Sequence, residues 1–193
     1  MVKKRVWVFV LLLIVFGAGS TVYASDSSQT NCITFSPTFS FQRIFYSVDN
    51  YTNRNGFGLG AEIAYDHFLN SKTTLGLASS YEFFVYRDWF NYNDFKVQAT
   101  VKRQILGKEG RTRLFATAGA GMDFVLRNDK DFGAYPLFNL GLETVFRCKD
   151  KTSVTLKTEA GITIQKGSVV LQANAGVGLR FSFGKALTGE KNK

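Results

Sequence analysis

Hydrophobic and polar residues alternate along the last regular stretch of the chain, residues 169–183. One set of alternate residues, from Val169 to Phe183, is wholly apolar, whereas the set between them is mostly polar or glycine. Because successive side chains of a strand point to opposite faces, this period of two predicts a strand between two contrasting environments. Soluble strands usually have about 5–6 residues, and a strand needs about 9–11 to cross a bilayer. The stretch is therefore long enough to span a membrane.

The same alternation recurs along most of the preceding chain. The predicted strands are 33–42, 57–69, 73–86, 94–106, 112–127, 135–147 and 152–165, followed by 169–183. Pro37 interrupts the first of them, because proline cannot donate to a strand ladder. Loops at 47–55, 87–93, 128–134 and 166–167 alternate with short turns at 70–72, 107–111 and 148–151. The pattern predicts an all-β fold, an eight-stranded antiparallel up-and-down transmembrane β-barrel within residues 25–183.

The volume of the apolar side chains indicates which face of this barrel points outward. A secreted soluble barrel with an apolar lumen, as in lipocalins, would show the same alternation. The core of a closed eight-stranded barrel holds on the order of a dozen bulky side chains, and the apolar set here is several times larger. The opposite set is rich in glycines, among them Gly58, Gly60 and Gly119, which suit a narrow interior. We therefore expect the apolar face to contact lipid.

Aromatic residues gather near the strand ends, as in the two girdles of membrane barrels. The group near the loops is Phe45, Tyr46, Tyr51, Tyr86, Trp89, Phe90, Tyr92, Phe132 and Tyr135. The group near the short turns is Phe68, Phe115, Phe146, Phe181 and Phe183.

The N-terminal residues 1–24 have the three parts of a cleaved signal peptide: the basic start Lys3–Arg5, the apolar run 6–16 and small residues before Ser25. No later hydrophobic segment is long enough for a transmembrane helix. Residues 184–193 form a polar tail, which we expect on the periplasmic side. Removal of the signal peptide takes three basic residues with it and lowers the net charge from +9 to +6. The remaining charges are spread along the chain without a Lys/Arg cluster, so a nucleic-acid partner is not expected.

Two cysteines, Cys32 and Cys148, would lie in an oxidising compartment, where a disulfide is permitted. They fall near the same end of the predicted barrel but on its first and sixth strands, which are not neighbours. Whether they pair is open at this point.

Charged residues occur among the glycines and polar residues of the predicted inward face. They are the acids Glu62, Asp66, Glu82, Asp123, Glu143 and Glu159, and the bases Lys96, Lys102, Lys157 and Arg180. Because an isolated buried charge is costly, these groups must be paired or hydrated. The simpler interpretation is a salt-bridged plug. The alternative is a gated conduit whose pairs exchange partners, with Glu143, Glu159 and Lys157 as the first place to look.

No catalytic or metal-binding motif is evident. His67, the only histidine, is predicted to point outward, and only Ser71 lies close to it in sequence, without a His-x-Ser pattern. One histidine and two separated cysteines match no metal-ligand spacing, and no phosphate-binding loop is present. We therefore expect neither an enzyme nor a cofactor site.

The end of the last predicted strand resembles the C-terminal β-signal that the barrel-assembly machinery recognises in outer-membrane proteins. Its residues are Asn174, Gly176, Leu179, Phe181 and Phe183. Over residues 25–183 the chain resembles the small eight-stranded outer-membrane barrels, the group of the OmpA transmembrane domain, OmpX and OmpW, although a polar tail follows Phe183. The resemblance implies a bacterial outer-membrane location, external loops, periplasmic termini, and membrane lipid and the assembly machinery as partners.

Two functions remain open from the sequence. The first is that of a monomeric structural and surface-interaction protein whose loops contact extracellular or host ligands. Its candidate contact residues are Tyr51, Arg54, Trp89, Phe90, Tyr92 and Asp131. The second is that of a narrow porin-like channel for small or hydrophobic solutes.

Overall fold

The computed structural model describes residues 31–46, 54–70, 72–86, 91–107, 112–127, 131–148 and 151–183. The predicted signal peptide, the leader 25–30 and the tail 184–193 lie outside the described residues. The strands are β1 (Asn31–Tyr46), β2 (Arg54–Phe68), β3 (Thr73–Tyr86), β4 (Asn91–Leu106), β5 (Thr112–Arg127), β6 (Asp131–Arg147), β7 (Thr152–Gln165) and β8 (Ser168–Phe183). Within these ranges no helix is long and apolar enough to cross a membrane.

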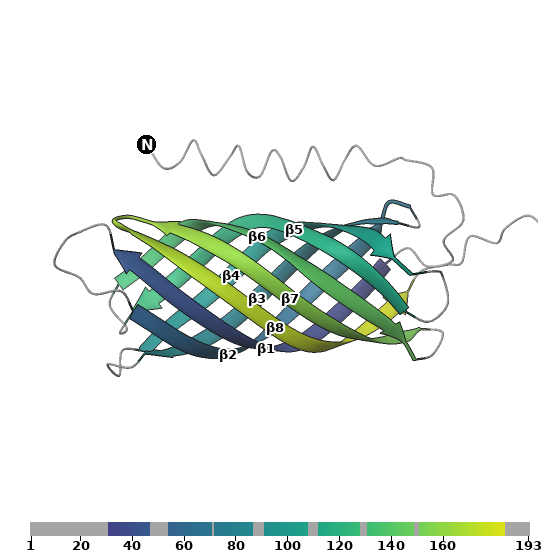
Figure 1. The fold of residues 1–193 in the computed structure, drawn as a ribbon, viewed down its shortest axis with the longest axis horizontal. Coiled ribbons are helices and arrows are strands. Elements are labelled where there is room, and N and C mark those ends of the chain that lie inside the picture. Colours follow the sequence, from purple (N-terminus) through teal and green to yellow (C-terminus); the bar gives the residue numbers. More distant parts are fainter. Residues whose placement is uncertain are drawn as a thin grey trace, which may run out of the picture.

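The strands form a closed antiparallel barrel in which each strand pairs with its neighbours in sequence and β8 pairs with β1 (Figure 1). Closure leaves no unpaired sheet edge. The predicted fold is therefore confirmed. We name the end at which β1 begins and β8 ends the terminus end, and the opposite end the loop end.

Several strands extend further toward the loop end than the sequence predicts. β1 continues to Tyr46, and β2, β4 and β6 begin at Arg54, Asn91 and Asp131. The predicted loop boundaries are wrong for this reason, and Arg54, Tyr92 and Asp131 are strand residues. The backbone groups of polar residues near the loops form strand hydrogen bonds as readily as those of apolar residues. The hydrogen-bonded strands therefore continue beyond the point where apolar and polar residues stop alternating in the sequence.

Pro37 lies inside β1 and leaves the strand intact. The β1–β8 register runs through Phe35 and Leu179 and resumes at Thr38 and Gly176, whereas on the other side Pro37 is opposite Ala61 of β2. The missing N–H therefore affects one ladder locally.

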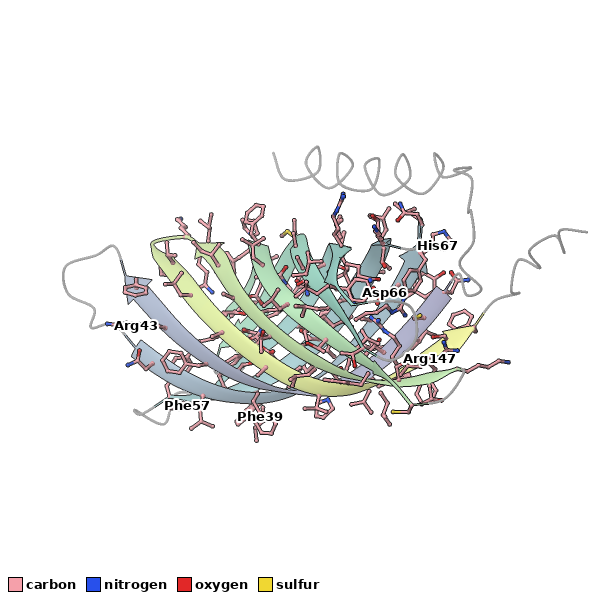
Figure 2. All side chains as sticks on the ribbon, turned by 45° about the vertical axis from the view of Figure 1, so that its right-hand side comes forward. Phe39, Arg43, Phe57, Asp66, His67 and Arg147 are labelled. Carbon is pink, nitrogen blue, oxygen red and sulfur yellow. The ribbon has the colours of Figure 1, made fainter. Side chains whose placement is uncertain are left out.

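The two faces of the barrel differ as predicted. Phe39 and Phe57 project away from the wall and Asp66 points into the interior (Figure 2). The outer wall is lined by exposed phenylalanines, leucines and valines, and most side chains of the lumen are polar.

The two predicted aromatic girdles are only partly correct. Phe68, Tyr86 and Phe115 are buried inside the barrel, and Tyr135 packs against a buried cluster. Each belongs to the inward set of its strand; Tyr86, for example, has the same parity as Glu82. Position near a strand end suggested a membrane interface, but parity along the strand decides the direction of the side chain.

Candidate functional site

The lumen contains a closed ring of four charges near the terminus end. Asp66, Lys102, Glu143 and Arg180 come from β2, β4, β6 and β8, so alternate strands contribute one residue each to this layer. Lys102 Nζ lies 2.8 Å from Asp66 Oδ2 and 2.8 Å from Glu143 Oε2. Arg180 Nη2 lies 2.7 Å from Asp66 Oδ2 and 2.6 Å from Glu143 Oε1. Each acid thus contacts both bases, and the ring spans the interior.

A second group of charges is centred on Lys157. Its Nζ lies 2.8 Å from both carboxylate oxygens of Glu62 and 3.0 Å from Glu159 Oε1. In the β6–β7 register Glu143 is directly opposite Lys157, but the Glu143 carboxylate contacts Lys102 and Arg180. The predicted site of Glu143, Glu159 and Lys157 is therefore divided between two ion-pair groups.

A third group lies toward the loop end around Lys96. Lys96 pairs with Glu82, and its Nζ is 3.8 Å from Asp94 Oδ2. Gln42 donates to Asp94 at 2.6 Å, and the Thr163 hydroxyl donates to Asp123 at 3.0 Å.

Asp94 is an inward acid that the sequence analysis missed. It is fully buried and shares the parity of Lys96. It was overlooked because it lies at the predicted start of the strand. It lies two residues before Lys96, so the alternation of β4 predicts that it points inward.

Buried apolar clusters lie toward both ends of the lumen. At the loop end, Ile44, Phe84, Tyr86, Val125 and Val170 form a buried cluster that we call the loop-end seal. It joins the charged interior, because the Tyr86 hydroxyl donates to Gln42 at 2.7 Å and Lys96 Nζ lies 5.7 Å from the Phe84 ring centroid.

At the other end, Cys32, Phe68, Phe115 and Val145 form the terminus-end seal. The Arg113 guanidinium lies 5.7 Å from the Phe68 ring centroid and 5.6 Å from that of Phe115, within cation–π range. The sequence does not predict either seal, because the inward set was assigned from its polar residues, charges and glycines alone.

Between the seals, the mid-lumen is tightly filled. A cavity between the Lys96 and Lys157 groups has a volume of about 10 Å³ and is lined by polar residues that include Gln98, Asn139 and Gln172. This volume is close to the minimum for one water molecule. Asn139 of β6 donates to Gln98 Oε1 of β4 at 2.5 Å, over the glycines of β5 between them. The arrangement suits a rigid plug better than an open conduit.

The remaining chemical candidates do not form a site in the described part of the chain. His67 is half-buried, and its Nδ1 lies 2.9 Å from the side-chain oxygen of Asn31; Ser71 lies outside the described residues. Cys32 is buried with its Sγ 3.3 Å from Ser182 Oγ, Cys148 is exposed, and both are free thiols. Over the same ranges no group of His, Cys, Asp or Glu is arranged to hold a metal ion.

The residues of the predicted assembly signal divide between the two faces of β8. Leu179, Phe181 and Phe183 are exposed on the outer wall, whereas Asn174 and Gly176 belong to the inward set. Of the predicted surface contacts, Tyr51, Trp89 and Phe90 lie outside the described residues.

The comparisons with known proteins identify the architecture. No family model matches the sequence, and no curated protein matches it. Neisserial surface protein A has a similar structure, with a TM-score of 0.55 and 10% identity over 78% of this chain and 97% of that protein. OprG from Pseudomonas aeruginosa gives a TM-score of 0.53 and 7% identity over 83% and 99% of the two chains.

This chain has the fold of the small eight-stranded outer-membrane barrels. The architecture expected from the alternation and from the C-terminal resemblance is thereby confirmed. At such low identities the likeness extends to the fold, and function has to be argued from the lumen and the surface.

Proposed function

We propose that this protein is a non-conducting barrel of the bacterial outer membrane with a structural role and a surface-interaction role. The observation that supports the proposal is a buried apolar cluster toward each end of the lumen, with three ion-pair groups between the two clusters. A channel for small solutes would need a continuous polar passage, and both seals interrupt it with apolar side chains.

The ion-pair groups support a rigid interior. Removing one partner of a buried pair leaves an uncompensated charge, which costs about 3–5 kcal/mol. In the terminus-end ring each acid contacts two bases, so the exchange of one partner would disturb the other three residues. Partner exchange is therefore a costly gating step.

The orientation proposed here places the loops outside the cell and the termini in the periplasm, which is the usual arrangement for a barrel with an even number of strands. The contact surface then comprises the loops 47–53, 87–90 and 128–130 with the strand ends that carry them. Tyr51, Arg54, Trp89, Phe90, Tyr92 and Asp131 remain the proposed contacts with an extracellular or host ligand. Membrane lipid and the barrel-assembly machinery are the other partners, and the barrel is monomeric.

Conductance of the refolded protein in planar bilayers tests the closed lumen. We expect no reproducible single-channel steps from the wild type. The double variant Phe84→Ala, Phe115→Ala removes one ring from each seal and should increase ion leakage, whereas the control Phe57→Ala changes only the outer wall. Wild-type steps that disappear in Glu143→Ala or Lys157→Ala would instead favour the channel.

A binding screen with loop-swapped variants tests the surface role. Each of the three loops is replaced in turn by a short Gly/Ser loop, and binding of whole cells to host matrix components is compared. We expect loss of binding on replacement of at least one loop, with unchanged amounts of folded barrel. Equal binding by all three variants would contradict a loop-borne contact surface.

A further inference from the structure

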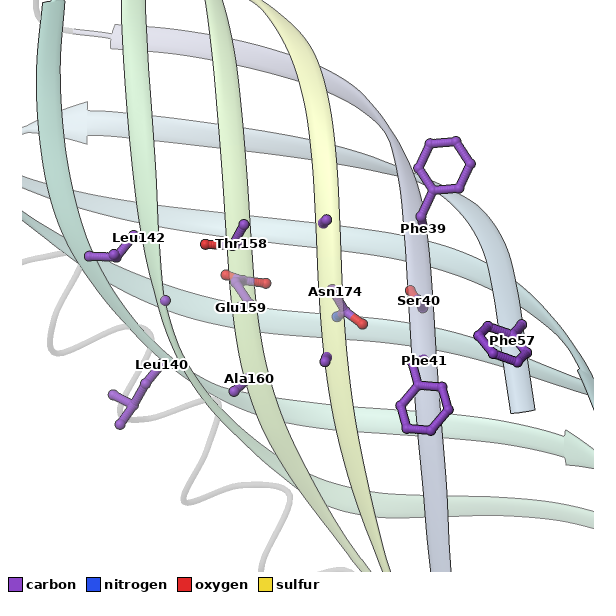
Figure 3. A pocket seen from close by; sticks show the side chains of 13 residues that line it. Phe39, Ser40, Phe41, Phe57, Leu140, Leu142, Thr158, Glu159, Ala160 and Asn174 are labelled. Atoms are coloured by element: carbon purple, nitrogen blue, oxygen red, sulfur yellow. The ribbon is translucent and has the colours of Figure 1, made fainter. Parts of the chain in front are cut away.

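The outer wall has a depression over β7 and β8 that the closed-lumen role does not use. Its floor consists of the outward residues Thr158, Ala160, Ala173 and Ala175. In the register, Thr158 is opposite Ala175 and Ala160 is opposite Ala173. The small side chains thus form a compact patch on two adjacent strands (Figure 3).

Larger side chains frame this floor across the strands. Leu142 and Leu140 of β6 are opposite Thr158 and Ala160, and Phe39 and Phe41 of β1 are opposite Ala175 and Ala173. Each of the two rows across the wall therefore has a large side chain at either end and two small side chains between them. Phe57 of β2, opposite Phe41, extends the aromatic side of the frame.

Further apolar pairs follow the floor in both directions along β7 and β8, outside the lining of the depression. Leu156 is paired with Val177 on one side of the floor, and Ile162 is paired with Leu171 on the other. The depression has a volume of about 620 Å³.

We propose that this depression binds one acyl chain of a membrane phospholipid. The inference rests on the membrane location of the proposed function. Thr158 and Ala175 lie close to the middle of β7 and β8, so the depression is near the bilayer midplane, where acyl tails and not headgroups are found. Its rim is aliphatic and aromatic, which matches a methylene chain.

The shape favours a thin, flexible occupant over a second barrel. The outer wall of a barrel is convex, so two rigid walls touch along a narrow line and leave a depression unfilled. A void whose lining has no partner atoms loses dispersion contacts, whereas an acyl chain follows the floor and contacts all sides of the frame. Phe39 and Leu140, exposed at 63% and 68%, stand on opposite sides as the walls of the site.

Native mass spectrometry of the protein extracted from membranes tests the proposal. The protein is exchanged into a non-ionic detergent that contains dipalmitoyl phosphatidylethanolamine, and the number of phospholipids retained per barrel is measured. The variant Ala160→Leu, Ala173→Leu fills the floor. The matched control Ala99→Leu, Ala118→Leu makes the same change at exposed alanines of β4 and β5.

We expect the wild type and the control to retain one phospholipid and the filled variant to retain about ten-fold less, because the two leucines occupy the floor and remove the dispersion contacts that hold the acyl chain there. Flotation with vesicles shows that each variant inserts; if the double variant does not, Ala173→Leu alone replaces it. Equal retention by the wild type and the filled variant would overturn the proposal. So would a wild-type dimer that the filled variant abolishes, because a second copy would then occupy the depression. Membrane insertion and bilayer conductance are measured separately, so loss of this site leaves the proposed function standing.

Discussion

Arg180 connects the two acids of the terminus-end ring, and its guanidinium is buried with Nη2 within 2.7 Å of both carboxylates. The ring can persist in an apolar-walled barrel because each charge has two opposite neighbours. Without Arg180, Asp66 and Glu143 would share only Lys102.

The variant Arg180→Met should therefore lower the free energy of unfolding by about 3–5 kcal/mol, the usual cost of breaking a buried ion pair from one side. Guanidinium-induced unfolding of the protein in lipid vesicles measures the change. The control Arg43→Met removes an exposed guanidinium 5.0 Å from the Phe45 ring centroid and should cost no more than about 1 kcal/mol. Equal losses in the two variants would contradict the ring as a stabilising unit.

Two inward glycines differ in how closely the neighbouring backbone packs against them. A Cβ atom at Gly121 would overlap the Val97 carbonyl oxygen, whereas one at Gly161 would lie 3.3 Å from Phe138 O and 3.6 Å from Asn139 Cβ. The first position has backbone in the way and the second borders the small mid-lumen cavity.

We expect Gly121→Ala to lower the free energy of unfolding by about 1–3 kcal/mol through overpacking. The same substitution at Gly161 should cost less than about 1 kcal/mol, because a shift of a few tenths of an ångström relieves its 3.3 Å contact and alanine restricts the unfolded chain. Parallel unfolding curves of the two variants measure the difference. A larger loss at Gly161 than at Gly121 would contradict the packing of the lumen described above.

The strands show which parts of the structure the alternation can predict. Period two identified all eight strands, their faces and most inward charges, because each face meets one environment along its whole length. Asp94 was missed because it lies at the predicted start of its strand. The two seals were missed because apolar residues point inward near the strand ends, where the two faces no longer differ in polarity. The ion-pair groups depend on which side chains reach across the barrel, and neighbouring-strand register alone does not give this.

Phe84 of β3 tests the loop-end seal at the scale of the strand. It is 0% exposed inside the barrel, whereas Phe57 of β2 is 72% exposed on the outer wall. Phe84→Ala should cost about 3–5 kcal/mol through the cavity it leaves, and Phe57→Ala should cost much less because lipid fills the space. Chemical unfolding in vesicles compares the pair. The reverse order would mean that the barrel is inside out with respect to the predicted faces.

The whole molecule depends on an apolar wall that faces acyl chains around a filled, polar lumen. If the protein were soluble, so many phenylalanines and leucines exposed on its surface would cause aggregation. In a bilayer the same side chains contact a solvent as apolar as themselves, and the closed ladder satisfies the backbone. The wall, the lumen and the proposed lipid site are consequences of this one arrangement.

Detergent removal from the purified mature protein tests the arrangement most directly. In the presence of phospholipid vesicles the protein should float with the lipid, and in buffer alone it should aggregate; sedimentation on a density gradient distinguishes the two. A compact, soluble monomer in detergent-free buffer would contradict the account, because it would place the large apolar face inside the molecule.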